Sequence, residues 1–393
     1  MDAFLAVLKQ YQTFGLVALI ATVFFTPLAM RAAFRFGVLD IPDRKLKPHA
    51  RPTPYLGGTA ICAAWALALL AALAAGVVTD ARTLVPLLLG GAGMSILGLI
   101  DDARTVRPKT RLLVGTVIIA GTILTTGIGF QLVDSVVAGA NKVLGWKVVV
   151  PPVVAVPASV LIGVFIVLGA CNSTNLIDGL DGLCSGVTAI ISGGFFLLAA
   201  HLAVWGYSDI GDPVRLTLAI AMLGAALGFL PWNFNPAKIF MGDAGSVLLG
   251  YNCGMLILLF AERGFFRWVI GALMIFALPA FDTALAMFRR WRAGRSIFEG
   301  DRSHFYDQLV QRGLTVRRTV LVCYGLTTLY AGIGLLLTWV RVGRDGAPLP
   351  VIRTLHAVFL YLAVCALTAW LAYCAGLTHP EENHRQPAPP DTD

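Results

Sequence analysis

Charged residues are scarce in this sequence. Of its 393 residues only 13% are Asp, Glu, Lys or Arg, whereas 57% are hydrophobic. A soluble domain carries about a quarter charged residues. The composition therefore excludes an ordinary soluble domain, and we expect an all-α, polytopic membrane protein.

Several catalytic and metal-binding signatures are also missing. The seven cysteines include no Cys-x-x-Cys pair or zinc spacing and lie in or beside apolar segments, which excludes a disulfide framework. There is no Walker A loop, no His-Glu zinc-protease pair and no Gly-x-Ser-x-Gly elbow. No repeat of 20–50 residues is present either. The chemistry must therefore come from other residues.

Long apolar segments dominate what is present. A helix that crosses the hydrocarbon core needs about 20 residues, and about 11 transmembrane helices are expected. The candidate spans are 13–30, 57–78, 84–100, 112–128, 153–170, 183–204, 215–231, 245–260, 268–288, 319–339 and 352–376. The spans 84–100 and 245–260 are the weakest, being short and glycine-containing. We expect one integral-membrane domain over 1–378 and a disordered cytoplasmic tail over 379–393, which is rich in Pro and acidic residues. The acidic start and the long first apolar segment indicate no cleavable signal peptide.

The basic residues are unevenly distributed between the loops. Most of the 30 Lys and Arg residues lie in the loops after the first, third and ninth spans. Because cytoplasmic loops are enriched in Lys and Arg, the N-terminus is predicted to lie outside and the C-terminus inside. The same rule explains the net charge of +8 without nucleic acid. The polar loops all fall on this predicted cytoplasmic face, so we expect an active-site cleft there.

Two acidic motifs are candidates for metal chemistry. Asp101 and Asp102 end the third span, where one or both could hold a metal or act as a base, or simply form a solvated helix end. Adjacent helical residues point about 100° apart, so both reach one ion only if the helix ends there. Asp243 lies in a segment that begins at Asn233 and includes Lys238, before the eighth span. It could bind a metal, or cap the span that follows.

Further polar residues recur between spans. Asn172, Asn175, Asp178 and Asp181 are spaced by three, in what we interpret as a polar loop that binds a ligand or merely forms turns. Asp282 lies inside the ninth span, where it faces a substrate or pairs with Arg289. The histidines of the polar cytoplasmic loops lie among basic residues, which suits phosphate binding; they are His49 and His304.

With these residues in hand, the chain resembles the polyprenyl-phosphate N-acetylhexosamine-1-phosphate transferase family from about Ile41 to Gly313. Five motifs carry the resemblance: Lys47-Pro-His49-Ala-Arg-Pro52, Asp101-Asp102 with Pro108-Lys109, Asn172-x-x-Asn175-x-x-Asp178-Gly-Leu-Asp181-Gly, Asn233-x-x-Pro236-Ala-Lys238 through Asp243-Ala-Gly-Ser246, and Asp301-Arg302-Ser303-His304. Arg111 stands where a Lys is usual. In the fifth motif, Tyr306 and Asp307 replace two usual histidines.

The resemblance implies a Mg²⁺-dependent (or Mn²⁺-dependent) enzyme of the bacterial plasma membrane. It would transfer N-acetylhexosamine 1-phosphate, most simply GlcNAc 1-phosphate, from a UDP-sugar to polyprenyl (undecaprenyl) phosphate and release UMP, as the first membrane step of a cell-envelope glycan such as lipopolysaccharide or teichoic acid. Its expected partners are both substrates, the lipid bilayer and, in a homodimer, a second copy of the chain. The rivals are a phospho-N-acetylmuramoyl-pentapeptide transferase and, from another class, a lipid or solute transporter.

The resemblance also implies roles for residues. Asp243 is expected to be the principal metal ligand, with Asp101 and Asp178 as further ligands. Asp101, Asp102 and Asp243 are the expected catalytic carboxylates. Tyr306 and Asp307 are hypothesised to contact the sugar. The remaining candidates would bind the substrates; they are Lys47, His49, Lys109, Asn172, Asn175, Asp181, Asn233, Lys238, Asp282, Arg302 and His304.

The charge distribution yields a test of topology. Single cysteines at positions 142 and 238 of a cysteine-free variant should react differently with an impermeant maleimide on intact cells, because Lys142 is predicted outside and Lys238 inside. Labelling should occur at 142 only. Labelling of position 238 from outside would reverse the orientation.

Overall fold

The computed structural model describes residues 2–41, 52–104, 106–205, 212–261, 266–296, 304–342 and 348–378. Within these ranges ten helices are long and apolar enough to cross a membrane, and α10 with α11 forms an eleventh span if the bent pair is counted as one. The all-α polytopic fold and the expected number of spans are therefore confirmed.

The elements follow one another as a series of helices with two short antiparallel hairpins. They are α1 (Asp2–Phe36), β1 (Leu39–Asp40), β2 (Thr53–Pro54), α2 (Gly57–Ala74), α3 (Ala81–Ala103), α4 (Pro108–Thr126), α5 (Leu132–Leu144), α6 (Pro152–Ile177), α7 (Leu183–Val204), α8 (Asp212–Asn233), α9 (Gly242–Leu259), α10 (Phe266–Ile275), α11 (Ala277–Arg292), α12 (Phe305–Gln311), α13 (Val316–Thr338), β3 (Val340–Val342), β4 (Pro348–Pro350) and α14 (Thr354–Cys374).

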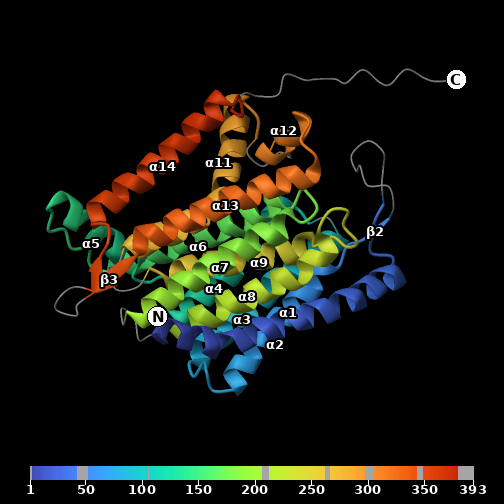
Figure 1. Ribbon diagram of the computed structural model, residues 1–393, viewed down its shortest axis with the longest axis horizontal. Helices are drawn as coiled ribbons and strands as arrows, with labels where there is room; N and C mark the ends of the chain where they lie inside the picture. Colours follow the sequence, from blue (N-terminus) through green and yellow to red (C-terminus); the bar gives the residue numbers. More distant parts are fainter. Residues whose placement is uncertain are drawn as a thin grey trace.

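Helix α9 forms the centre of the bundle. In its span 94% of the residues are buried, against 11% in α14, which crosses the periphery of the molecule (Figure 1). Helices α2, α3 and α6 surround α9. The short, glycine-containing span predicted at 245–260 is therefore the most enclosed one, because a helix surrounded by protein need not be strongly apolar.

Glycines let the neighbouring helices approach the start of α9. A Cβ atom added to Gly98 of α3 would lie 2.5 Å from the carbonyl carbon and oxygen of Asp243. Backbone bonds from Gly57 to Phe240 and from Gly58 to Met241 hold the start of α2 against the same segment. The end of α3 and the start of α2 thus fix where α9 begins.

Several polar segments predicted to be loops are helix ends instead. Helix α6 continues to Ile177, so Asn172 and Asn175 are helical, and the segment 232–246 contains the end of α8 and the first turn of α9. Asn172, Asn175 and Asp243 therefore project from helices. This differs from the sequence interpretation because Asn and Gly favour turns locally, whereas packing between helices decides here.

The ninth predicted span is broken. Helices α10 and α11 meet at an angle of 74°, and Figure 1 shows α11 leaving the bundle toward α12. The short helices α5 and α12 were not predicted, because neither is long enough to produce a spanning signal. The break brings Asp282, in α11, to α12 rather than into a continuous membrane span.

The close contact at Gly98 can be tested with a matched pair of variants. Gly98→Ala should lower the melting temperature of the purified protein in detergent, because the new methyl group meets the backbone of Asp243 and Ala244. Gly93→Ala, in the same helix, meets only Ile118 at 3.5 Å and should be neutral or stabilising. Equal melting temperatures for the two variants would contradict this account of the α3–α9 contact.

Candidate active site

The ends of α1 and α3, the start of α9 and the β1–β2 hairpin meet around a cleft of about 640 Å³. Its lining includes the carboxylates of Asp40, Asp101, Asp102 and Asp243, together with Tyr55. Strand β2, which precedes Tyr55 of this cleft, lies at the end of the bundle opposite the N-terminus (Figure 1). A cleft with this lining is strongly acidic and attracts cations.

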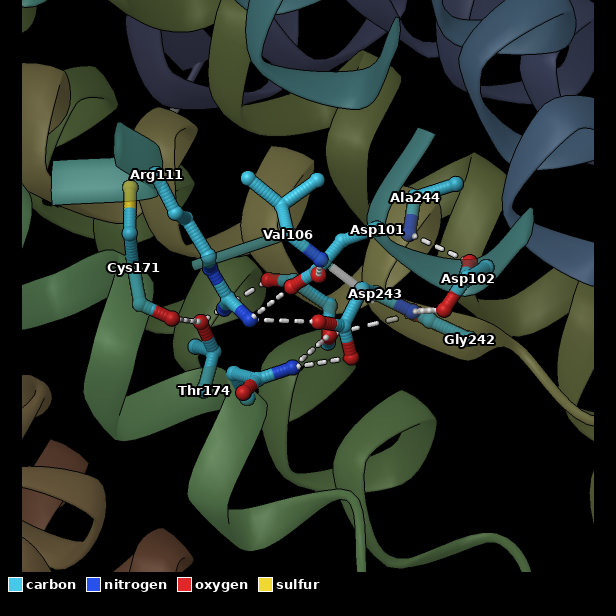
Figure 2. A network of polar contacts seen from close by, with 11 residues as sticks. Asp101, Asp102, Val106, Arg111, Cys171, Thr174, Gly242, Asp243 and Ala244 are labelled. Carbon is cyan, nitrogen blue, oxygen red and sulfur yellow. Dashed lines mark hydrogen bonds and ion pairs between the residues drawn. The ribbon is translucent and has the colours of Figure 1, made fainter. Parts of the chain in front are cut away.

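Arg111 of α4 joins two of these carboxylates. Its Nη1 atom donates to Oδ2 of Asp101 and to Oδ2 of Asp243, each at 2.6 Å. Asp101 also accepts a bond from the backbone N–H of Val106 at 2.8 Å. Figure 2 shows the guanidinium between the two acidic groups. Residues from α3, α4 and α9 are thereby held at one point.

Asp102 has a different role from its neighbour. Its carboxylate oxygens accept bonds from the backbone N–H groups of Asp243 at 2.9 Å and Ala244 at 3.2 Å (Figure 2). These N–H groups lie in the first turn of α9, where the helix itself offers them no acceptor. A negative charge is favourable at this end of a helix. Asp102 thus caps α9 from another helix, whereas the sequence interpretation had Asp243 as a possible cap.

Asn175 connects α6 to the same centre. Its Nδ2 donates to Oδ1 of Asp243 at 2.7 Å and to Oγ of Ser246 at 3.1 Å. The hydroxyl of the preceding residue, Thr174, donates to the carbonyl of Ser246 at 2.8 Å. Asp243 therefore has partners on both of its oxygens, so its orientation is fixed by α4 and α6.

The other members of the Asn/Asp series separate from one another. Asp178 ends α6, and burial and the nearby carboxylates of Asp243 and Asp102 raise its pKa well above the usual range. Asp181 accepts bonds from Asn235 at 3.0 Å and from the N–H of Ala237 at 2.9 Å. Asn172 is exposed and donates within its own helix to Leu168. It lies outside the network around Asp243, and its predicted contact with substrate stays a prediction.

Asn233 is a buried residue with structural contacts. It is 3% exposed. Its Oδ1 accepts bonds from the N–H of Gly182 and the hydroxyl of Ser185, while its Nδ2 donates to the carbonyl of Ile239. These contacts join the end of α8 to the start of α7. The predicted contact of Asn233 with substrate stays a prediction.

Asp282 and His304 form a buried pair. Nδ1 of His304 lies 2.7 Å from Oδ2 of Asp282, and Oδ1 of Asp282 accepts the N–H of Phe305 at 3.0 Å. Asp282 is 1% exposed. It therefore orients His304 and caps the first turn of α12. The predicted contact of Asp282 with a substrate stays a prediction. The role of His304 toward a donor stays a prediction.

Tyr306 lies against this pair. Its ring stacks on His304 with centroids 5.4 Å apart, and its hydroxyl donates to the carbonyl of Leu176 at 2.6 Å. It is 2% exposed, so the hypothesis that its ring stacks on a sugar is wrong for this conformation. Asp307 is partly exposed. Tyr306 instead attaches α12 to the end of α6.

The remaining candidates lie outside this network or outside the described residues. Lys109 and Lys238 are exposed, and the ammonium of Lys238 lies 5.5 Å from the centre of the Trp232 ring. Lys47, His49 and Arg302 fall outside the described residues. Their predicted phosphate contacts stay predictions.

Sequence reasoning missed three residues at the cleft. Arg111 was noted only as a departure from the family pattern, and Asp40 and Tyr55 were not proposed as site residues. Burial and the carboxylates of Asp102 and Asp243 raise the pKa of Tyr55, so its hydroxyl remains a hydrogen-bond donor. For Asp40 and Tyr55 the sequence offered one signal, their position on either side of the first basic motif, which contains Lys47 and His49.

A divalent metal fits this centre through two carboxylates. Oδ2 of Asp101 and Oδ2 of Asp243 face one position, which Nη1 of Arg111 occupies. Among the described residues, no three Asp, Glu, His or Cys side chains gather closely enough to hold a metal, so Asp178 does not complete the predicted trio. Mg²⁺ commonly uses one or two carboxylates with water and substrate phosphates.

The revised role of Tyr306 is testable. Tyr306→Phe should lower the free energy of unfolding by about 1 kcal/mol through loss of the bond to Leu176. Tyr306→Ala should cost about 3–5 kcal/mol, because it also removes the buried ring. The ratio of kcat/KM between two UDP-sugars should be unchanged in Tyr306→Phe; a shifted ratio would restore the sugar-reading role.

Comparison with known proteins agrees with this architecture. The model of glycosyl transferase family 4 matches residues 84–261, which include the acidic pair and Asp243. The chain is 33% identical over 311 residues to a probable undecaprenyl-phosphate N-acetylglucosaminyl 1-phosphate transferase of Bacillus subtilis, covering 79% of this chain and 80% of that protein.

Two other relatives cover similar shares. Decaprenyl-phosphate N-acetylglucosaminephosphotransferase of Mycolicibacterium smegmatis is 32% identical, with 81% of this chain and 79% of that protein covered. Phospho-N-acetylmuramoyl-pentapeptide-transferase of Mycobacteroides abscessus is 29% identical, with 82% and 94% covered. The chain therefore belongs to glycosyl transferase family 4, among the polyprenyl-phosphate N-acetylhexosamine-1-phosphate transferases.

Proposed function

We propose that this protein transfers GlcNAc 1-phosphate from UDP-GlcNAc to a polyprenyl phosphate and releases UMP. The observation that carries the proposal is the convergence of Asp101 and Asp243 on one cation position beside an acidic cleft. The names of the relatives that transfer GlcNAc phosphate to undecaprenyl or decaprenyl phosphate support the choice of both substrates.

In the proposed reaction, an oxygen of the lipid phosphate attacks the phosphorus atom that bears the sugar. A new P–O bond forms, the bond from that phosphorus to the bridging oxygen breaks, and UMP leaves with the electron pair. A lipid monophosphate is largely ionised near pH 7, since the second pKa of a phosphomonoester is about 6. The reaction therefore does not require a strong general base.

Charge neutralisation is the main demand of this reaction. Both substrates are anions, and the four carboxylates that line the cleft are also negative. Cations must therefore lie between the substrates and the carboxylates. Asp243 and Asp101 would hold Mg²⁺ or Mn²⁺. When bound, the ion would neutralise the diphosphate. Arg111 is the basic side chain already in contact with this position.

The chain's own residues position these groups. Asp102 fixes the first turn of α9, and Asn175 fixes the second oxygen of Asp243. We therefore infer that Asp102 acts as a positioning residue rather than as a general base. Tyr55 can donate its hydroxyl hydrogen to a phosphate at the cleft.

The membrane setting is consistent with this chemistry. The cleft lies at one end of the helix bundle, where a polyprenyl chain could remain in the bilayer while its phosphate reaches the carboxylates. We propose that this end faces the cytoplasm at the plasma membrane, because most basic residues lie in loops on that side. The single domain over 1–378 and a homodimer stay predictions.

A pentapeptide-bearing donor is the second candidate, since the chain is 29% identical to a phospho-N-acetylmuramoyl-pentapeptide-transferase. A donor screen with the purified enzyme and polyprenyl phosphate, measuring UMP, separates the two. Turnover with UDP-GlcNAc but not UDP-muramoyl-pentapeptide supports the proposal, and the reverse contradicts it. A transporter would release no UMP with any donor.

The metal assignment predicts the effect of one substitution. Asp243→Asn should reduce UMP release by about 100-fold or more, because neutralisation of phosphate charge by a metal is worth several kcal/mol. Asp134→Asn, an exposed carboxylate in α5, should retain full activity. Size-exclusion profiles in detergent should show that both variants fold. More than a tenth of wild-type activity in Asp243→Asn would contradict the assignment.

A further inference from the structure

Arg111 places a single atom between two acidic groups. Its Nη1 lies 2.6 Å from Oδ2 of Asp101 and 2.6 Å from Oδ2 of Asp243 (Figure 2). The side chains are largely enclosed, with 23% of Arg111, 12% of Asp101 and 21% of Asp243 exposed. Short hydrogen bonds from a guanidinium to carboxyl oxygens are stronger in an enclosed setting than on an open surface.

The same two oxygens are the ligands that the proposed function gives to a divalent metal. A guanidinium nitrogen cannot accept a coordinate bond, because Arg has donors only and stays protonated. Arg111 cannot therefore become a third ligand. It also carries the same sign of charge as the metal, so the two repel each other when both are close to these oxygens.

We propose that Arg111 competes with the divalent cation for Asp101 and Asp243, and that binding of the cation releases the guanidinium to pair with a substrate phosphate. This inference rests on the proposed function, which supplies the metal and the phosphate. The planar fork of Arg suits phosphate oxygens in a bidentate arrangement. Arg111 would thus couple occupation of the metal site to binding of the donor.

A structural role makes the opposite prediction. If Arg111 only ties α3, α4 and α9 together, its removal would leave two carboxylates that repel each other and a less ordered metal site. Metal affinity would then fall or stay unchanged. Asp102 and Asn175 hold Asp243 independently of Arg111, so the geometry of the site does not depend on the guanidinium alone.

The first experiment measures Mn²⁺ binding by electron paramagnetic resonance, without substrate or turnover. Arg111→Gln should lower the Kd for Mn²⁺ by about tenfold or more, since each charged hydrogen bond given up by the wild type is worth at least that factor. Arg107→Gln removes the same charge from an exposed position four residues away and should change the Kd by less than about twofold. An unchanged or weaker affinity in folded Arg111→Gln overturns the competition.

The second experiment uses the wild-type protein, so it does not depend on the variant folding. Phenylglyoxal modification of Arg111 is followed by peptide mass spectrometry, with Arg104 and Arg107 as internal references. Saturating Mg²⁺ should increase modification of Arg111 relative to both references, and adding UMP with Mg²⁺ should suppress it again. No increase with Mg²⁺ contradicts release, and no suppression by UMP contradicts the phosphate contact.

These results separate the inference from the proposed function. If wild-type protein releases UMP and binds Mn²⁺ but Arg111→Gln binds it no more tightly, the competition is wrong and the function stands. If Asp243→Asn neither weakens Mn²⁺ binding nor reduces UMP release, the metal assignment in the proposed function is wrong, and the inference fails with it.

Discussion

The arrangement of the cleft depends on how the first turn of α9 is held. This turn is buried between α2, α3 and α6, where its free N–H groups would be costly without partners. Asp102 supplies the partners from α3, and the glycine at position 98 brings the two helices close enough for these bonds. At the opposite end of α9, Arg215 donates to the carbonyl of Leu259. An acidic side chain at the start of the helix and a basic one at its end both complement its dipole.

Once α9 is fixed, Asp243 has little freedom. Asn175 and Arg111 contact its two oxygens from α6 and α4, so two neighbouring helices decide where the carboxylate points. Such a site is rigid before any ligand arrives, which is what charge stabilisation in phosphoryl transfer requires. Burial and, after it, the gathered carboxylates raise the pKa of Asp178. Arg111 offsets part of the negative charge at Asp101 and Asp243.

A second polar cluster stabilises the other side of the site. Asp282 orients His304 and caps α12, and Tyr306 joins α12 to the carbonyl of Leu176 in α6. The end of α6 is thus held by α9 on one side and by α12 on the other. Because Asn175 and Asp178 lie within two residues of Leu176, the position of α12 is linked directly to that of the cleft.

The sequence by itself determined the membrane class, the number of spans and the acidic residues that matter, because length, hydropathy and the identity of charged residues between apolar segments are local properties. The tertiary structure decided which partner each carboxylate contacts. Asp101 and Asp102 are neighbours in the chain, yet they diverge to Arg111 and to α9, since adjacent helical side chains point about 100° apart. The partner of Asp282 lies 22 residues away, and Tyr306 became buried rather than open to a sugar. Those outcomes depend on how distant helices pack, and no spacing along one segment encodes that.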